Sequence, residues 1–217
     1  MHLDVMSILA IGFLMGIRHA IEPDHVIAVS TIASASKSLW RSSLAGVFWG
    51  IGHTATLFVV GLVLIVFQAH VPERWSLSLE FLVGIMLVVL GANSLRASKA
   101  QYEDGSQVAI HPATSYRRST LVGFVHGLAG SAALAVLTMT TVSNVWGAMA
   151  YIFVFGAGTV LGMLIFTTAL GVPFVWSRRV PRLPERLGIC TGLVSTVFGM
   201  YYMYNLGVTE GLFQMWM

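Results

Sequence analysis

The sequence predicts an all-α polytopic membrane protein, a bundle of about six transmembrane helices. Charged residues make up 10% of the 217 residues and hydrophobic residues 56%, with a mean hydropathy of +0.80. A soluble domain usually carries about 25% charged residues, so this chain cannot cover itself with a solvated surface. Apolar runs also recur at roughly the 17–25 residues that cross a bilayer. One transmembrane domain over 1–217 is therefore expected.

Six apolar regions follow one another along the chain, at about 4–35, 43–68, 77–97, 119–140, 145–176 and 187–207. The first is interrupted at Pro23. The first and fifth exceed one crossing, so they must tilt, break or re-enter. The first run also resembles a signal peptide, but it carries Asp4 and no basic residue before its apolar part. We therefore expect it to stay in the protein as a helix.

Ten of the twelve Lys and Arg residues lie in alternate connections between these regions. Those connections hold Lys37, Arg41, Arg96, Lys99, Arg117, Arg118, Arg178, Arg179, Arg182 and Arg186. The opposite side has only Arg74, and Arg18 lies inside the first region. The positive-inside rule then predicts an integral plasma or inner membrane protein with cytoplasmic basic loops and both termini outside.

The two halves of the chain resemble each other. The repeated segments are GFLMGI at Gly12–Ile17 with GFVHGL at Gly123–Leu128, FWGIGHT with VFGAGT, and Gly84 and Gly91 with Gly192 and Gly199. Three spans in each half give an inverted repeat, typical of secondary transporters. Repeat one would cover about 4–97, a cytoplasmic loop about 97–118, and repeat two about 119–210. The alternative is that these glycines serve helix packing only.

Five ionisable groups lie within RHAIEPDH, inside the first apolar region. Charge in a bilayer is costly, so the default reading is functional. On an unbroken helix His19 and His25 would point apart. Pro23 lacks an N–H and clashes with the preceding turn, so a break there lets His19, Asp24 and His25 converge and leaves the His19 carbonyl as a further oxygen. The alternative is a capped helix break with an Asp24–Arg18 ion pair.

Imidazole and carboxylate form a ligand set suited to Ni²⁺, Co²⁺, Zn²⁺ or Fe²⁺. His53, in the middle of the second span, would complete such a set, or would simply be hydrogen-bonded to a neighbour. His126 lies at the repeat position of Met15 and could be a ligand, a partner of a ligand, or a gate. Glu22 is a further candidate that could exchange protons.

His2 requires its own interpretation. With a free terminal amine it could form a square-planar nitrogen site of the kind that Ni²⁺ accepts. The alternative is an ordinary residue on an external terminus.

Several function classes are excluded. Cys190 is the single cysteine, so a CxxC redox pair is impossible. The formal charge of +3 is too small for nucleic-acid binding. No His-Glu-x-x-His, Ser/His or paired-Asp arrangement occurs in the spans, so we expect no enzyme. We also expect no prosthetic group, and no nucleotide-binding motif is present.

The motifs resemble those of a known family. RHAIEPDH fits His-x4-Asp-His, FWGIGHT fits a Gly-His-Thr/Ser signature in the next helix, and HGLAGSAAL at His126–Leu134 is similar to a motif in the second half of shorter members. Together they look like the nickel/cobalt transporter family, NiCoT/NicO, especially its shorter six-span, urease-accessory-type relatives. The resemblance implies transport of Ni²⁺ or Co²⁺, with His19, Asp24, His25 and His53 at the signature positions. The Asp/Thr-rich motif of longer, eight-span members is missing.

These observations predict a permease for divalent transition-metal ions that works by alternating access around the broken first span. Its partners would be the metal ion and the bilayer, with a homo-oligomer as a further option. The alternative is a non-transporting accessory or sensor subunit that binds metal or haem through the intramembrane histidines.

Overall fold

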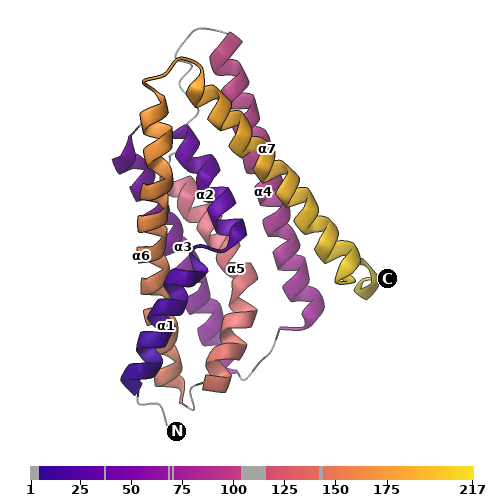
Figure 1. The fold of residues 1–217 in the computed structure, drawn as a ribbon. Helices are drawn as coiled ribbons and strands as arrows, with labels where there is room; N and C mark the ends of the chain where they lie inside the picture. Colours follow the sequence, from indigo (N-terminus) through magenta and orange to yellow (C-terminus); the bar gives the residue numbers. More distant parts are fainter. Residues whose placement is uncertain (1–4, 37, 68, 70, 104–115, 142–143) are drawn as a thin grey trace.

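The computed structural model describes residues 5–36, 38–67, 69, 71–103, 116–141 and 144–217 (Figure 1). The regular structure in these ranges is entirely helical. The elements are α1 (Val5–His19), α2 (Pro23–Ala35), α3 (Leu39–Val66), α4 (Glu73–Glu103), α5 (Tyr116–Thr141), α6 (Val145–Ser177), α7 (Leu183–Tyr204), the π-helix η1 (Asn205–Thr209) and α8 (Leu212–Met215).

The helices follow the apolar regions closely, which confirms a helical membrane bundle. In the described part of the chain, α3, α4, α6 and α7 with η1 are long and apolar enough to cross a membrane. The pair α1 and α2, bent by 55°, passes the same test as one broken span. Helix α4 continues to Glu103, past residue 97, and the cytoplasmic loop expected at about 97–118 stays a prediction.

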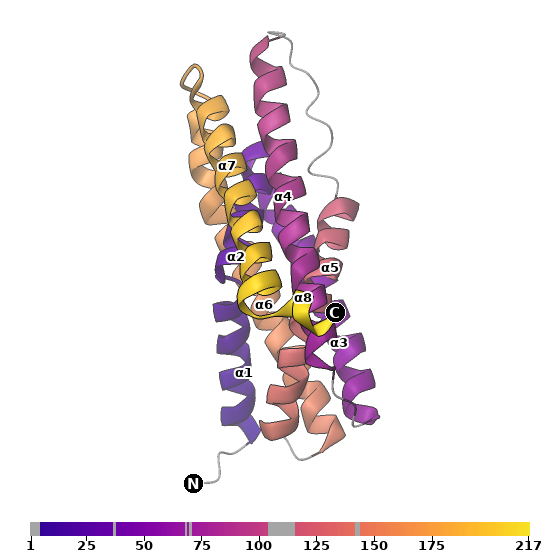
Figure 2. The same cartoon turned by 90° about the vertical axis from the view of Figure 1, so that its right-hand side faces the viewer.

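The helices pack in a simple order. Helix α3 lies between α5 and α6, α1 packs against α6, and α4 packs against α7. Helix α2 contacts α4, α6 and α7, so it joins the α4–α7 pair to the other helices. Figures 1 and 2 show the α4–α7 pair side by side along most of its length, at one side of the bundle.

Glycines bring the helix backbones into contact. A Cβ at Gly16 on α1 would meet the backbone carbonyl of Phe155 on α6, and one at Gly123 on α5 would meet the carbonyl of Trp49 on α3. Small residues at such crossings permit the close approach on which membrane helix packing depends. The outer surface is apolar as well: Leu14, on the outside of α1, is 64% exposed. An apolar outer face is what lipid contact requires.

Candidate metal site

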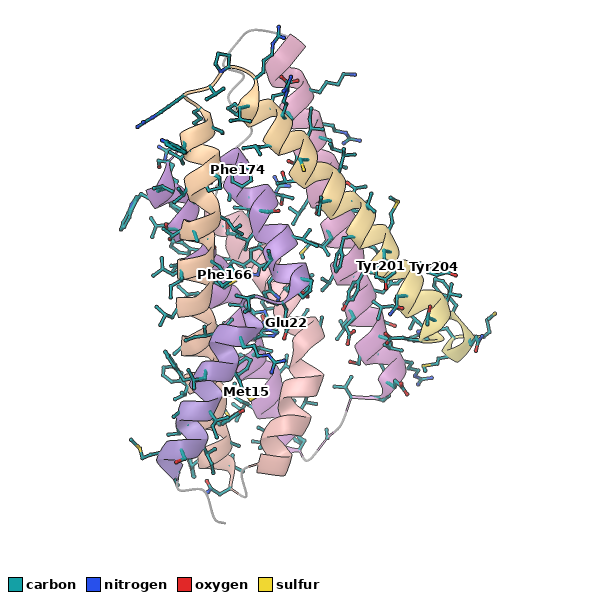
Figure 3. All side chains as sticks on the ribbon, viewed as in Figure 1. Met15, Glu22, Phe166, Phe174, Tyr201 and Tyr204 are labelled. Carbon is teal, nitrogen blue, oxygen red and sulfur yellow. The ribbon has the colours of Figure 1, made fainter. Side chains whose placement is uncertain are left out.

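The site begins at the break between α1 and α2. Helix α1 ends at His19, Glu22 adopts an extended backbone (φ −62°, ψ 147°), and Pro23 occupies the first turn of α2. The break therefore lies where the missing N–H of proline predicts it. The elbow is near the middle of the bundle, as the position of Glu22 in Figure 3 shows. The His19 carbonyl is not free, because it accepts the backbone N–H of Glu22 at 3.1 Å.

The break brings three histidines together. The ring centroids of His19 and His25 are 4.6 Å apart, although six positions separate them in the chain. His53, from the middle of α3, places its Nε2 3.0 Å from the Nε2 of His19, and its ring centroid is 5.2 Å from that of His25. The predicted convergence of these side chains is thus present in the structure.

Asp24 connects this group to a fourth histidine. Its Oδ2 lies 2.8 Å from Nε2 of His126 on α5, and its Oδ1 accepts the backbone N–H of His25 at 2.9 Å. The same Oδ1 is 3.2 Å from Nδ1 of His25. The alternative Asp24–Arg18 ion pair does not form, because the Arg18 side chain makes no ion pair with any described residue.

Two candidates from the sequence remain, Glu22 and His2. Glu22 lies at the rim of the site, with Oε2 2.9 Å from Nδ1 of His19 and a half-exposed side chain. It contacts one edge of the His19 ring while the other edge faces His53. His2 falls outside the described residues, so its involvement stays a prediction.

The inner histidines are almost completely buried. His25 and His53 are each 1% exposed and His126 is 3% exposed. Trp49 covers His25 with a stacked ring at 6.1 Å. The Nε2 of His25 and the Nδ1 atoms of His53 and His126 are buried without a hydrogen-bond partner among the described residues. Burying an unpaired polar atom costs about 1–3 kcal/mol, so these nitrogens call for an explanation other than stability.

The donor atoms form two overlapping trios. One is His19, His25 and His53, the other is Asp24, His25 and His126, and within each trio the donor atoms lie within 4.8 Å of one another. With metal–nitrogen bonds of about 2.1 Å, two donors on one ion are about 3 Å apart at right angles and about 4 Å apart when opposite. The 3.0 Å His19–His53 distance matches the first value. Both trios therefore need only small side-chain movements to hold an ion.

A cavity of about 710 Å³ opens beside these side chains. Its wall is formed by residues of α1 to α7 and of the α1–α2 connection: Met15, Arg18, His19, Ile21, Glu22, Pro23, Asp24, His25, Leu57, Glu80, Val83, His126, Ala129, Gly130, Phe155 and Tyr202. Figure 3 marks Met15 and Glu22 on the α1 side of this region. Glu80 and Tyr202 were absent from the predicted site. The argument from charge in an apolar span, used for RHAIEPDH, would have identified Glu80.

Comparison with known proteins points to one family. Residues 5–92, which include the break and His53, match the NicO model, described as a high-affinity nickel-transport protein. The urease accessory protein UreH of Bacillus sp. (strain TB-90) is 54% identical over 222 residues, covering 98% of this chain and 97% of that relative. No solved structure matches.

Two plant proteins are more distant relatives. The chloroplast proteins FOR GROWTH AND FERTILITY 1 and 2 of Arabidopsis thaliana are 28% and 24% identical over 210 and 213 residues, covering 87% and 91% of this chain. This chain covers 56% of the length of each. The near full-length match to UreH, together with the nickel-transport model over residues 5–92, leads to one conclusion: this chain belongs to the NicO family of nickel-transport proteins.

Proposed function

We propose that this protein is a membrane permease for Ni²⁺ or Co²⁺ that binds the ion among His19, Asp24, His25 and His53. Family membership supports metal transport in general, and the two overlapping donor trios are the observation that carries the site. The donors are imidazole nitrogens and a carboxylate, which suit Ni²⁺ and Co²⁺ and lack the sulfur that Cu⁺ prefers.

His126 joins the site in this proposal. It completes the second trio with Asp24 and His25, so the ion would have two neighbouring positions that share His25. Movement between them requires a change at one or two ligands rather than complete release. Glu22 would orient the His19 ring through their 2.9 Å contact. Outer partners of this kind typically change metal affinity by about 10–100-fold.

We further propose six spans in a 3+3 inverted repeat, with α5 as the sixth crossing. Such a repeat relates α1 to α5, α3 to α6 and α4 to α7. The helix contacts agree with this symmetry: α1 packs on α6, and the equivalent pair α5 and α3 also packs together. The pairs α3–α6 and α4–α7 are each formed by two equivalent helices. The matching close approaches are Gly16 to Phe155 and Gly123 to Trp49, then Gly158 to Phe13 and Gly52 to Thr120.

These close approaches also change which residue of the first repeat corresponds to His126. They superpose Gly16 on Gly123, one helical turn from the match of GFLMGI with GFVHGL, and so pair His126 with His19 rather than with Met15. The two histidines would then supply equivalent ligands from the two repeats. Alternating access would exchange the environments of these repeats around the elbow at Pro23.

We also propose a membrane orientation for the chain. The charge distribution supports a single domain over 1–217 with the basic connections in the cytoplasm and both termini outside. A homo-oligomer stays an option. The name of the Bacillus relative suggests that the ion serves urease.

Metal analysis with competition binding tests the proposed function. Purified wild-type protein should bind Ni²⁺ and Co²⁺, and proteoliposomes containing it should take up radiolabelled Ni²⁺. His19→Ala removes one donor, so its Ni²⁺ affinity should fall by at least about tenfold. Equal binding and uptake in the two proteins, at equal amounts in the membrane, would refute the site.

Acid should weaken metal binding, because histidine ligands must be neutral to coordinate. A protonated imidazole cannot coordinate a metal, so lowering the pH makes protons compete with the ion for the ring nitrogens. We expect Ni²⁺ affinity to fall as the pH is lowered from about 7.5 to about 4.5, by at most about tenfold per pH unit for each histidine that competes for a proton. Calorimetric titrations in buffers of different ionisation enthalpy would count the protons released, and a pH-independent affinity would contradict histidine ligation.

A non-transporting subunit that binds metal or haem is the second candidate, supported by the intramembrane histidines and by the relative's name as an accessory protein. The same preparations separate the candidates. Tight Ni²⁺ binding without uptake would favour the accessory function, and a Soret band in the purified protein would favour haem.

A further inference from the structure

A second acidic group faces the cavity from the α4–α7 pair. Glu80 on α4 lines the same cavity as Asp24 and His25, but it belongs to a different pair of helices. It lies in an apolar span, where an ionisable side chain is costly to place and is usually functional. Its presence at this wall therefore needs a reason.

The partners of Glu80 are neutral. The hydroxyl of Tyr202 on α7 donates to Oε2 at 3.4 Å, and the hydroxyl of Ser76, one turn earlier on α4, donates to Oε1 at 3.5 Å. Both bonds are long, so they orient the carboxylate weakly and leave it able to accept further bonds. Among the described residues, no basic side chain forms an ion pair with Glu80.

The position of this carboxylate is set by close packing between α4 and α7. A Cβ at Gly91 would lie 2.7 Å from the carbonyl oxygen of Gly192, and one at Gly199 would lie 2.8 Å from that of Gly84. These contacts determine how α4 is rotated against α7, and they bring Glu80 and Tyr202 together on one wall. Figures 1 and 2 show the two helices running side by side.

The donor chemistry here differs from that at the elbow. A carboxylate with a phenol and an alcohol hydroxyl offers oxygen atoms only, which suit hydrated divalent cations such as Mg²⁺ and Mn²⁺ and do not select among transition metals. The imidazole trios at the elbow select borderline metals instead. Glu80 can therefore bind a divalent ion that retains its hydration shell.

We propose that Glu80, oriented by Tyr202 and Ser76, is a second cation position, which holds the hydrated divalent ion in the same cavity as the histidines before ligand exchange. The proposal rests on the proposed function for its place in a transport path. The binding position itself does not depend on transport. Glu80 thus contributes to capture of the ion, and the histidines contribute to its selection.

Binding of Mn²⁺ tests the position without any transport. The probe is Mn²⁺ alone, followed by electron paramagnetic resonance on purified His25→Ala protein, in which the histidine site is impaired. We expect weak Mn²⁺ binding that falls by about tenfold or more when Glu80→Gln is added, as loss of one carboxylate beside a divalent ion predicts. Unchanged Mn²⁺ binding in the double variant would overturn the proposal.

Uptake kinetics test the role in capture. In proteoliposomes, Glu80→Gln should raise the KM for Ni²⁺ and for Co²⁺ by the same factor, about tenfold, with a maximal rate close to wild type. Glu80→Asp should recover part of this loss. The matched control is Glu73→Gln, since Glu73 is an exposed carboxylate at the start of the same helix, outside the cavity wall.

The outcomes are distinguishable. A wild-type KM in Glu80→Gln would overturn the capture role. If the pH dependence of uptake were lost at the same time, Glu80 would be assigned to proton transfer instead. If the wild-type protein moves no metal, the proposed function fails, while the Mn²⁺ measurement still decides whether Glu80 binds a cation.

Discussion

Replacing His25 with alanine is expected to abolish Ni²⁺ transport and to weaken Ni²⁺ binding by at least about 100-fold. His25 is the residue that belongs to both donor trios, so its loss removes a ligand from each ion position. No neighbouring donor can move into its place easily, because the ring is 1% exposed and packed between Trp49 and His126. Equilibrium binding to purified protein and uptake into proteoliposomes measure the two effects.

A control must separate loss of a ligand from loss of packing. Leu87→Ala truncates a fully buried side chain on α4 that offers no donor atom, so it leaves a cavity without changing the site. Folded Leu87→Ala protein should keep its Ni²⁺ affinity. His25→Gln retains much of the volume of the ring and should still fail to transport. Transport by either His25 variant at the wild-type rate would remove this residue from the site.

Replacing Gly16 with alanine is expected to destabilise the protein by about 2 kcal/mol and to reduce uptake by at least about tenfold. The added Cβ would overlap the Phe155 carbonyl and would lie 2.9 Å from the backbone nitrogen of Thr159. Backbone atoms of α6 cannot rotate away as a side chain could, so α1 must move outward. His19 lies one turn further along α1 and would leave His53. Thermal unfolding in detergent and Ni²⁺ uptake measure both consequences.

Gly130→Ala is the matched substitution. A Cβ at Gly130 on α5 would lie 3.9 Å from Cδ2 of Leu57, an ordinary contact. In a helix, alanine is favoured over glycine by about 0.8–1.0 kcal/mol, so this variant should be as stable as wild type or more so. The expected changes in stability at Gly16 and Gly130 have opposite signs because the two glycines differ in their tertiary contacts. Equal melting temperatures and uptake for the two variants would contradict the packing at α1 and α6.

Much of the helix arrangement could be predicted from local chain properties. Apolar length decides whether a segment can cross a bilayer, and the described helices follow the predicted regions closely. The break is local as well, since proline removes an N–H whatever lies around it. The prediction that the His19 carbonyl would be free was wrong. The chain turns at the break, and the carbonyl there accepts the backbone N–H of Glu22.

The candidate site was only partly predictable. His19, Asp24 and His25 share one segment, so one break explains their convergence. The partner of Asp24 was not predictable in this way. The sequence suggested an ion pair with Arg18, six positions away, whereas in the structure Asp24 pairs with His126 of α5. Its charge within an apolar span would have marked Glu80 in the sequence, but its rotation toward the cavity depends on the packing of α4 against α7.

The sequence by itself determined the class of protein, the order of the apolar helices, the break at Pro23 and the residue types for a metal site. These follow from hydropathy, backbone chemistry and ligand preference, which belong to each segment alone. Only the tertiary structure decided which donors meet. Contacts at Gly16, Gly91 and Gly123 set how far each helix approaches the next and how it is rotated. A side chain faces an ion or lipid according to that rotation, which no single segment contains.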